Sequence, residues 1–144
     1  MEKLKNKNMK NCIFCKIIKE EIPCYKIYED DLVLAFLDIN PIARGHTLII
    51  PKEHKENIFE IDSIVLERIV SVAKKIAEKM KINGAEGVNL YHASGLSAEQ
   101  TVFHFHLHVI PRTKGDGISF VSAGQAKAIE KTEFEEILSK LKID

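Results

Sequence analysis

The sequence has no excess of charge of either sign, because 21 Lys and Arg residues balance 21 Asp and Glu residues among 144. Broad electrostatic binding to nucleic-acid polymers or anionic membranes depends on clustered cationic excess, so we expect neither as a partner. A small phosphate ligand is compatible with this balance, since a pocket can bind phosphate through a few local hydrogen-bond donors.

Long hydrophobic runs are also missing. The longest extend over only a few residues, as at 47–50, which is far short of a membrane-spanning helix. Residues 1–11 are polar and rich in Lys and Asn, without the apolar segment of a secretion signal. We therefore expect a cytoplasmic protein with a flexible tail over residues 1–11 and a single domain over residues 12–144.

Cysteine is scarce, and three residues are too few for a disulfide framework. Cys12 and Cys15 form a Cys-x-x-Cys pair, which is compatible with two packed thiols, a redox pair or half of a zinc site. The redox interpretation is the least favoured, because a thioredoxin-like pair opens a helix after a long buried strand and nothing strand-like precedes Cys12.

Hydrophobic periodicity predicts an α+β fold of mostly antiparallel strands with one long helix laid across them. The long helix is expected over residues 62–81, and a C-terminal helix over 132–141 with its apolar residues inward, namely Phe134, Ile137, Leu138 and Leu141. A short helix is expected over 12–20. The expected strands are 26–29, 32–37, 46–51, 87–92 and 102–110.

Three of the six histidines alternate with apolar residues in the last of these strands. On a strand, alternate side chains share a face about 6.5–7 Å apart, so His104, His106 and His108 are expected to point the same way. Folding gains little from aligned titratable rings, which indicates a functional site. The spacing does not decide between a metal site and a catalytic site, because His-x-His pairs bind zinc and a central imidazole can also attack phosphorus.

Residues 100–112, Gln-Thr-Val-Phe-His-Phe-His-Leu-His-Val-Ile-Pro-Arg, resemble the histidine triad (HIT) motif. The resemblance to bacterial HIT nucleotide-binding proteins covers residues 12–118. It includes, in the same order, the stretches 12–17, 35–39 and 45–52 and residue His54. It implies the HIT-like fold, with a long helix, a C-terminal helix and a sheet that becomes larger and continuous in a homodimer formed through the long helix and the sheet edge.

The same resemblance implies a hydrolase or nucleotidyl transferase acting at the α-phosphate of purine nucleoside phosphoramidates or dinucleoside polyphosphates. In the family the middle histidine is the nucleophile, so His106 would form a nucleotidyl-histidine intermediate. The catalytic set carried over is His106, His108, His104 and Thr101. The substrate-binding set is Asp38, Ile39, His46, Glu99, Gln100, Thr101, His106 and His108, with Asp38 accepting hydrogen bonds from the ribose hydroxyls.

Zinc-binding members of the family pair a Cys-x-x-Cys with two histidines. If this ligand set applies to the present sequence, Cys12, Cys15, His54 and His104 would hold one structural zinc ion per chain. Two thiolates and two imidazoles make a closed tetrahedral set that leaves no position for substrate.

The sequence departs from the family pattern at two positions near the expected phosphate site. Glu99 occurs where the family often has Gly, and Ala93 where it often has Asn. These departures keep open a second hypothesis, a nucleotide-binding module with little turnover that acts through a protein partner. A third hypothesis is a metal-dependent hydrolase in which the triad itself holds zinc.

Overall fold

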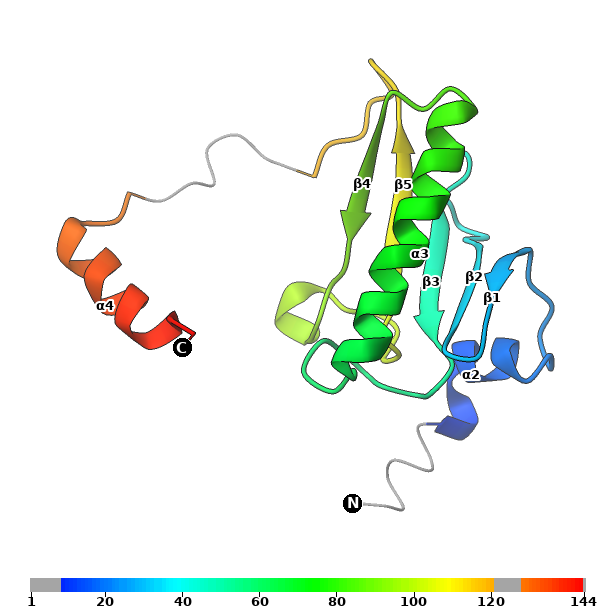
Figure 1. The fold of residues 1–144 in the computed structure, drawn as a ribbon, viewed down its shortest axis with the longest axis horizontal. Helices are drawn as coiled ribbons and strands as arrows, with labels where there is room; N and C mark the ends of the chain where they lie inside the picture. Colours follow the sequence, from blue (N-terminus) through cyan, green and yellow to red (C-terminus); the bar gives the residue numbers. More distant parts are fainter. Residues whose placement is uncertain (1–8, 121–127, 144) are drawn as a thin grey trace.

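The computed structural model describes residues 9–120 and 128–143, and the ribbon is shown in Figure 1. Residues 1–8 of the predicted tail lie outside this range, and residues 9–11 are helical. In chain order, the helices and strands are α2 (Ile13–Ile18), β1 (Lys26–Glu29), β2 (Val33–Leu37), β3 (Thr47–Pro51), α3 (Ser63–Ile82), β4 (Gly87–Tyr91), the short 3-10 helix η1 (Leu96–Ala98), β5 (Leu107–Arg112) and α4 (Lys131–Leu141).

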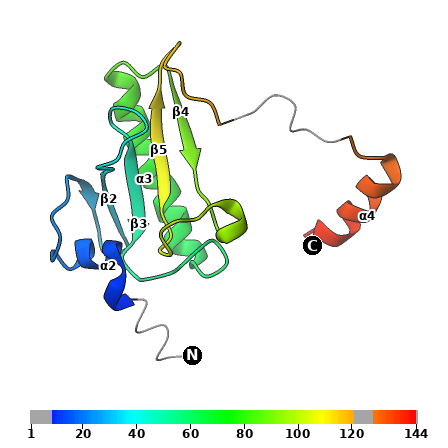
Figure 2. The ribbon, with the colours of Figure 1, turned by 180° about the vertical axis from the view of Figure 1, so that it is seen from behind.

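The five strands form one sheet in the order β1-β2-β3-β5-β4, and every neighbouring pair is antiparallel. Helix α3 crosses one face of the sheet, whereas α2 lies at the other side, as the two opposite views in Figures 1 and 2 show. The predicted α+β class with one long helix is therefore confirmed. Within the described ranges, no helix is both long and apolar enough to cross a membrane.

Apolar residues fill both faces of the sheet. Under α3, the main cluster consists of Val33, Ala35, Ile49, Ile61, Ile69, Val72, Ala73, Ile76, Phe105, Leu107 and Val109. On the α2 side, a smaller cluster consists of Phe14, Ile17, Leu34, Phe36, Leu48 and Ile50. Because alternate residues of a strand face opposite ways, the central strands contribute to both clusters, and the sheet is buried on two sides.

The predicted strand over 102–110 is wrong in its first half, since β5 begins only at Leu107. Its neighbour β3 ends at Pro51, a residue with no backbone N–H to donate to a ladder. The carbonyl oxygen of Pro51 instead accepts a hydrogen bond from Nε2 of His104 at 2.9 Å. The first two triad histidines consequently lie on an irregular segment, and only His108 lies on β5.

The C-terminal helix occurs where it was predicted, but its apolar face is not turned inward. Helix α4 has no buried residue. Phe134, Ile137, Leu138 and Leu141 are all exposed. Periodicity located the helix correctly, yet it could not say whether a surface of the same domain would cover it.

Candidate active site and metal centre

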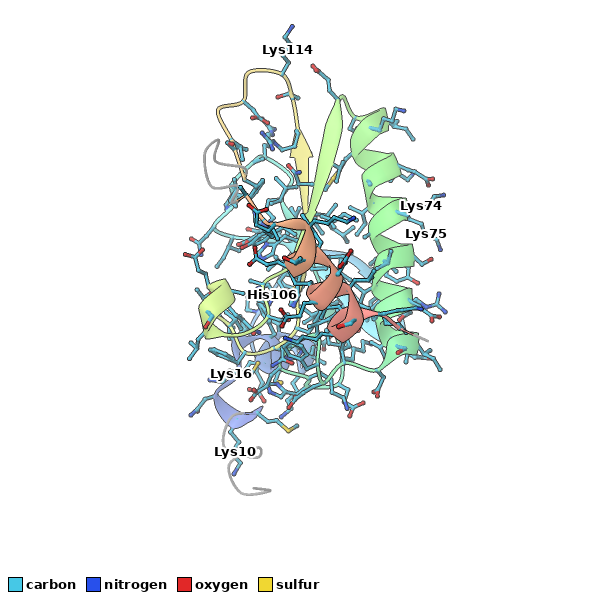
Figure 3. All side chains as sticks on the ribbon, turned by 90° about the vertical axis from the view of Figure 1, so that its left-hand side faces the viewer. Lys10, Lys16, Lys74, Lys75, His106 and Lys114 are labelled. Atoms are coloured by element: carbon cyan, nitrogen blue, oxygen red, sulfur yellow. The ribbon has the colours of Figure 1, made fainter. Side chains whose placement is uncertain are left out.

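The three triad histidines share one side of the chain even though the first two precede β5. The residues between and after them, Phe105, Leu107 and Val109, are buried in the cluster under α3. The imidazoles turn to the opposite side, where Phe14 of α2 packs edge-on against His104 and His106 at ring-centroid distances of 5.8 and 5.2 Å. His106 is labelled in Figure 3, on the side away from α3. Its ring lies 4.9 Å from that of His108.

One backbone carbonyl fixes the tautomer of the central imidazole. A carbonyl oxygen can only accept a hydrogen bond, so Nδ1 of His106 must carry the proton that it shares with the oxygen of His104 at 2.7 Å. The opposite nitrogen, Nε2, is then left with its lone pair. His106 is 8% exposed, so its ring is held firmly while a small part of it still reaches solvent. This is the arrangement that a nucleophilic imidazole requires.

The last triad histidine, His108, is oriented by a chain of two hydrogen bonds that starts in the loop before β3; we call it the imidazole relay. The N–H of Ile42 donates to Nδ1 of His46 at 3.1 Å, so the proton of the buried His46 ring lies on Nε2. That proton is donated to Nδ1 of His108 at 2.8 Å. His108 must therefore carry its own proton on Nε2, where it is available to an acceptor such as a phosphate oxygen.

Burial keeps all three triad imidazoles neutral near pH 7. Loss of solvation lowers the pKa of His104 to about 4 and that of His108 to about 3, and neighbouring imidazoles add to the effect at His108. Burial likewise lowers the pKa of His106. A neutral ring has the free nitrogen that attack on phosphorus or binding of a metal needs.

The first triad histidine belongs to a separate cluster with Cys12, Cys15 and His54. The two Nδ1 atoms of the histidines lie 3.2 Å apart, and the sulfur-to-nitrogen distances are 3.3–3.6 Å. Tetrahedral coordination with Zn–N near 2.0–2.1 Å and Zn–S near 2.3 Å requires edges of about 3.3–3.8 Å. The geometry therefore fits a tetrahedral metal ion, and zinc is the metal that this donor set favours.

The tautomer of His104 is the one that binding of a metal at this cluster requires, whereas the Cys15 thiol stays protonated without a cation. The Nε2–H of His104 donates to the carbonyl of Pro51, which leaves Nδ1 unprotonated toward the sulfur atoms. Burial, followed by the neighbouring Cys12, raises the pKa of the Cys15 thiol to about 12. A bound cation would reverse that shift, because metal coordination deprotonates a thiol.

The low pKa of His108 predicts a loss of stability in acid. Its folded-state pKa of about 3 lies below the ordinary 6.5, so the unfolded chain binds a proton as pH falls through 6.5 while the folded chain does not. The stabilising contribution is thus present above pH 6.5 and is lost at lower pH. Between pH 7 and 5, the free energy of unfolding of wild type should fall more than that of His108→Asn. The difference between the two proteins should be less than about 1.4 kcal/mol per pH unit, because part of the His108 ring is solvated.

This prediction is checked by urea unfolding of both proteins at pH 7, 6 and 5. Release of a metal in acid would affect both proteins alike and cancels in the difference between them. Parallel losses of stability in the two proteins would contradict the assignment of an unprotonated, partly buried His108.

Asp38 lies beside the imidazole relay. One oxygen, Oδ1, accepts a hydrogen bond from the N–H of Asn40 at 2.8 Å, and the other, Oδ2, is 3.7 Å from Nε2 of His46. The second distance is too long for a hydrogen bond, so that oxygen keeps its capacity to accept one from a ligand. The adjacent Ile39 is 74% exposed, as expected for a residue available to a bound molecule.

The side chain of Gln100 holds the loop before the triad in place through hydrogen bonds. Its amide oxygen accepts from the N–H of Gly95 at 2.7 Å, and its amide nitrogen donates to the carbonyls of Glu56 and Val102 at 2.6 and 3.0 Å. The side chain is only 4% exposed. Gln100 therefore shapes the loop, and its direct contact with phosphate stays a prediction. The side chain of the next residue, Thr101, is exposed.

Sequence reasoning did not foresee the role of His92. Its Nδ1–H donates to the carbonyl of His106 at 2.9 Å, and its Nε2 pairs with the hydroxyl of Ser94 at 2.5 Å. That hydroxyl oxygen also accepts from the N–H of Ile58 at 2.9 Å. His92 stacks on Phe105 with 4.1 Å between ring centroids. The residues on either side of Ala93 thus anchor the backbone of the central histidine, which no spacing in the sequence revealed.

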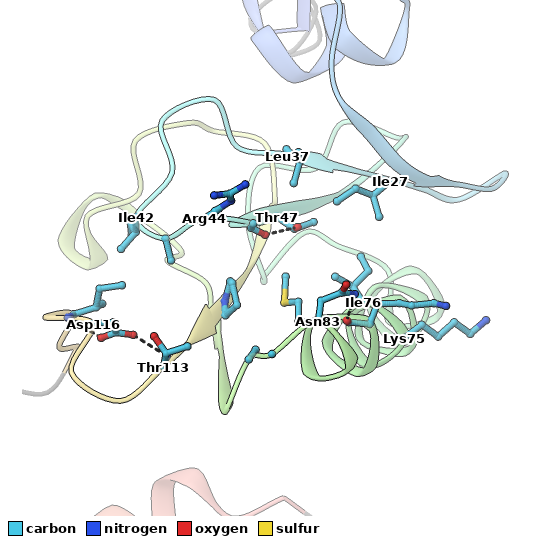
Figure 4. A pocket seen from close by; sticks show the side chains of 18 of the residues that line it. Ile27, Leu37, Ile42, Arg44, Thr47, Lys75, Ile76, Asn83, Thr113 and Asp116 are labelled. Carbon is cyan, nitrogen blue, oxygen red and sulfur yellow. Dashed lines mark hydrogen bonds between the residues drawn. The ribbon is translucent and has the colours of Figure 1, made fainter.

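A large cavity lies on the other face of the sheet, between the C-terminal half of α3 and the strands (Figure 4). It has a volume of about 730 Å³, and no triad histidine lines it. Its walls are mainly apolar, with contributions from Ile27, Leu37, Ile42, Val72, Ile76 and Met80. We call this cavity the α3 groove.

The sequence matches the HIT domain family over residues 19–115. The chain belongs to the histidine triad family. A HIT family protein from Bacillus anthracis has a crystal structure that is similar to this HIT protein with a TM-score of 0.83 and 46% identity, covering 91% of this chain and 94% of that one. The expected family and fold are therefore confirmed.

Two further relatives bear on the chemistry of this HIT protein. The adenosine 5'-monophosphoramidase of Schizosaccharomyces pombe is 40% identical over 135 residues, which is 92% of this chain and 99% of that protein. A Zn-bound histidine triad family protein from Mycobacterium smegmatis has a crystal structure with a TM-score of 0.74 and 40% identity, covering 78% of this chain and 82% of that one.

In this HIT protein, Glu99 replaces the glycine that the family often has, at a position where the backbone conformation is unfavourable for other residues. Glu99 adopts the left-handed conformation, with φ of 64° and ψ of 29°, directly after η1. Glycine takes this conformation without the steric penalty of a Cβ atom, and for other residues the penalty is roughly 1 kcal/mol. The Gly expected at this position from the resemblance is thus the residue that the turn favours, and Glu99 carries both backbone strain and an exposed carboxylate.

Proposed function

We propose that this HIT protein is a nucleotide hydrolase or nucleotidyl transferase that acts at the α-phosphate of purine nucleoside phosphoramidates or dinucleoside polyphosphates. The observation that carries the proposal is the state of His106, a neutral, buried imidazole whose Nδ1–H is held by the carbonyl of His104. Its Nε2 is the only ring nitrogen left to react. The similarity to an adenosine 5'-monophosphoramidase supports the phosphoramidate as a substrate class.

The reaction proceeds through a covalent intermediate in two steps. The lone pair on Nε2 of His106 forms a bond to the α-phosphorus, while the bond from phosphorus to the leaving amine breaks and its electron pair stays with the amine nitrogen, which takes a proton from solvent. Water then attacks the nucleotidyl-histidine and gives up a proton to solvent, while the phosphorus–nitrogen bond breaks and its electron pair returns to Nε2. Neutral His106 is thus regenerated with release of nucleoside monophosphate. For dinucleoside polyphosphates the leaving group is a nucleotide oxygen.

The neighbouring residues support the charge that develops at phosphorus. The Nε2–H of His108, fixed by the relay through His46, donates to a non-bridging phosphate oxygen. Thr101 lies near the leaving group, and Asp38 accepts hydrogen bonds from the ribose hydroxyls beside Ile39. In this assignment the chain positions the donors before the substrate arrives, which reduces reorganisation in the transition state.

We further propose that Cys12, Cys15, His54 and His104 hold one structural zinc ion per chain. The interatomic distances of the cluster and the Zn-bound relative support this assignment. When bound, zinc would fix the N-terminal segment to the residues that precede β5. His104 would then be rigid, and its carbonyl would hold the Nδ1–H of His106 in place.

A homodimer is the assembly that we propose, with the long helix and the sheet edge as the interface. Strand β4 is an edge strand of the sheet, and Leu90 on it is 52% exposed. Helix α3 carries further exposed apolar residues, including Ile64 and Val70. An unpaired strand edge next to exposed apolar side chains is a surface that a second copy can cover.

A nucleotide-binding module with little turnover is the second candidate, and Glu99 favours it. An exposed carboxylate at the end of the loop next to the triad repels an anionic phosphate. In that case the biological role would depend on a protein partner that recognises the nucleotide-loaded form.

The experiment that separates the candidates is a panel of adenosine and guanosine phosphoramidates and dinucleoside polyphosphates, assayed with wild type and His106→Ala. The enzyme hypothesis predicts multiple turnovers by wild type on at least one class and none by the variant. Tight nucleotide binding by wild type without turnover on any member of the panel would support the binding module.

Replacing Glu99 by glycine is expected to improve both stability and activity. The substitution removes left-handed strain, which should raise the free energy of unfolding by up to about 1 kcal/mol. It also removes a negative charge near the proposed phosphate site, so kcat/KM should rise. Urea unfolding and initial rates on the best substrate of the panel measure the two effects.

The matched control is Glu20→Gly, because Glu20 is the other non-glycine residue of the described chain with a left-handed backbone, at φ of 61°. This variant should gain similar stability with unchanged kcat/KM. Equal rate changes in the two variants would show that Glu99 has no electrostatic effect on the substrate.

A further inference from the structure

The two strands beside the central histidine separate just before they reach it. Strand β4 pairs with β5 as far as Tyr91 and His108, and continued pairing in that register would place Ala93 opposite His106. Instead, β4 ends at Tyr91 and β5 begins at Leu107. In Figure 1 the chain after β4 bends away from β5. Among the described residues, no backbone N–H donates to the carbonyl of His106, although a buried carbonyl needs a donor.

The imidazole of His92 spans this gap. Its Nδ1–H donates to the carbonyl of His106 at 2.9 Å, in place of the backbone N–H that a longer β4 would supply. Nε2 of the same ring then has only a lone pair, and it accepts the hydroxyl proton of Ser94 at 2.5 Å. The Ser94 oxygen in turn accepts the N–H of Ile58 at 2.9 Å. We call this chain of hydrogen bonds, from Ile58 through Ser94 and His92 to His106, the His92 bridge.

The ring of His92 is kept in the state that the His92 bridge requires. Burial lowers its pKa, so the ring is neutral near pH 7 and has a single proton to donate. The ring stacks on Phe105 with 4.1 Å between centroids and 27° between planes, which limits its rotation. Phe105 is buried in the apolar cluster under α3. The stack therefore joins the bridge to the core of the domain.

The bridge matters because no strand ladder holds the segment that carries His106. The ring of His106 is fixed through Nδ1, which donates to the carbonyl of His104, and its backbone is fixed through the carbonyl that accepts from His92. Together these two hydrogen bonds determine the direction in which Nε2 points. Attack on phosphorus requires close alignment of the attacking atom, so a displacement of about 1 Å can reduce the rate about a hundredfold.

We propose that His92 is a positioning residue for the nucleophile, because its hydrogen bond to the carbonyl of His106 fixes the backbone that directs Nε2 toward the α-phosphorus. His92 acts through His106 and has no contact with substrate in this assignment. Ser94 holds the far side of the ring and connects it to the segment at Ile58. The proposal deepens the proposed function, and it rests on the nucleophilic role of His106.

Two substitutions separate the hydrogen bond of His92 from the packing of its ring. His92→Phe keeps a ring on Phe105 and has no donor, whereas His92→Asn loses the stack and keeps an N–H at the position of Nδ1. We expect kcat of His92→Phe to fall about 10- to 100-fold, with KM within about threefold of wild type. The kcat of His92→Asn should stay within about threefold of wild type. Single-turnover rates of nucleotidyl-histidine formation should follow the same order.

Replacing Ser94 by alanine tests whether the bridge acts as one unit. Ser94→Ala should lower kcat less than His92→Phe does, and it should add little to His92→Phe, because the ring nitrogen that the hydroxyl holds is already gone. Ser97→Ala is the matched control and should keep the wild-type kcat, since Ser97 lies exposed on η1 and outside the bridge.

The order of the two His92 variants decides the proposal. A larger fall of kcat in His92→Asn than in His92→Phe would overturn it, because the packing of the ring would then be the property that matters. A wild-type kcat in His92→Phe would overturn it as well. If thermal unfolding shows that His92→Phe is not folded, His92→Gln takes its place, since the longer amide reaches the position of Nε2 and leaves the carbonyl of His106 without a donor.

A nuclear magnetic resonance measurement separates this proposal from the proposed function. In protein with isotope-labelled histidine, exchange of the His106 Nδ1–H with water reports how firmly the ring is held. This exchange should be at least about tenfold faster in His92→Phe than in wild type, and unchanged in His92→Asn. Absence of turnover by wild type on every substrate of the panel would contradict the proposed function. Equal exchange in wild type and His92→Phe would instead overturn the positioning role of His92.

Discussion

Replacing His106 by alanine is expected to reduce turnover by at least about a thousandfold, which corresponds to roughly 4 kcal/mol of transition-state stabilisation. The reason is chemical: the side chain with the free Nε2 lone pair is gone, and no neighbour has an equivalent one. His108 presents a proton on its outer nitrogen, and Nδ1 of His104 faces two sulfur atoms. Steady-state rates on the preferred phosphoramidate measure the effect.

Binding of nucleoside monophosphate to His106→Ala should stay within about tenfold of wild type, or roughly 1.4 kcal/mol, because the ribose and phosphate contacts come from other residues. Calorimetric titration measures this affinity, and an unchanged melting temperature shows that the fold is intact. A variant that keeps more than a tenth of wild-type turnover would contradict nucleophilic catalysis by His106.

Removing zinc is expected to destabilise the protein by about 4 kcal/mol when free zinc is a thousandfold above its dissociation constant, and to lower Tm by more than about 10 °C. Two thiols and two imidazoles meet within the cluster, and without a cation their facing sulfur and Nδ1 atoms have only weak thiol–imidazole hydrogen bonds to one another. The measurement is thermal unfolding before and after chelation, together with metal analysis, which should give about one zinc ion per chain.

Cys15→Ser should reproduce the effect of chelation, whereas Cys24→Ser should not, because Cys24 lies outside the cluster. A protein without metal that melts like wild type would contradict the structural site. Chelation also tests the third hypothesis. If the triad itself held a catalytic zinc ion, activity would disappear at temperatures at which the chelated protein is still fully folded.

The elements that the sequence predicts well are those defined by local periodicity. The stripe of α3 and the alternation in β2 and β3 depend on neighbouring residues, so the helix and the strands occur within a residue or two of their expected bounds. The break before β5 could not be foreseen in the same way. It arises because Pro51, more than fifty residues away, ends the neighbouring strand.

In the site as well, local features are predictable from the sequence and contacts between distant segments are not. Alternation placed the three imidazoles on one side, and the resemblance placed Asp38 and His46 near them. The carbonyl of His104 sets the tautomer of His106 locally, whereas the tautomer of His108 depends on distant contacts through Ile42 and His46. The hydrogen bond from His92 to the carbonyl of His106 likewise joins separate parts of the chain. Such contacts follow from the packing of the sheet and leave no pattern in the sequence.

Single-turnover incubation of wild type with a purine nucleoside 5'-phosphoramidate, followed by alkaline quenching and peptide mass spectrometry, tests the nucleophile most directly. We predict a nucleotidyl group on one histidine of the peptide containing residues 104–108, located at His106 and absent from His106→Ala. Complete conversion of substrate with no modified histidine at any sampled time, or modification of a different residue, would contradict covalent catalysis by His106.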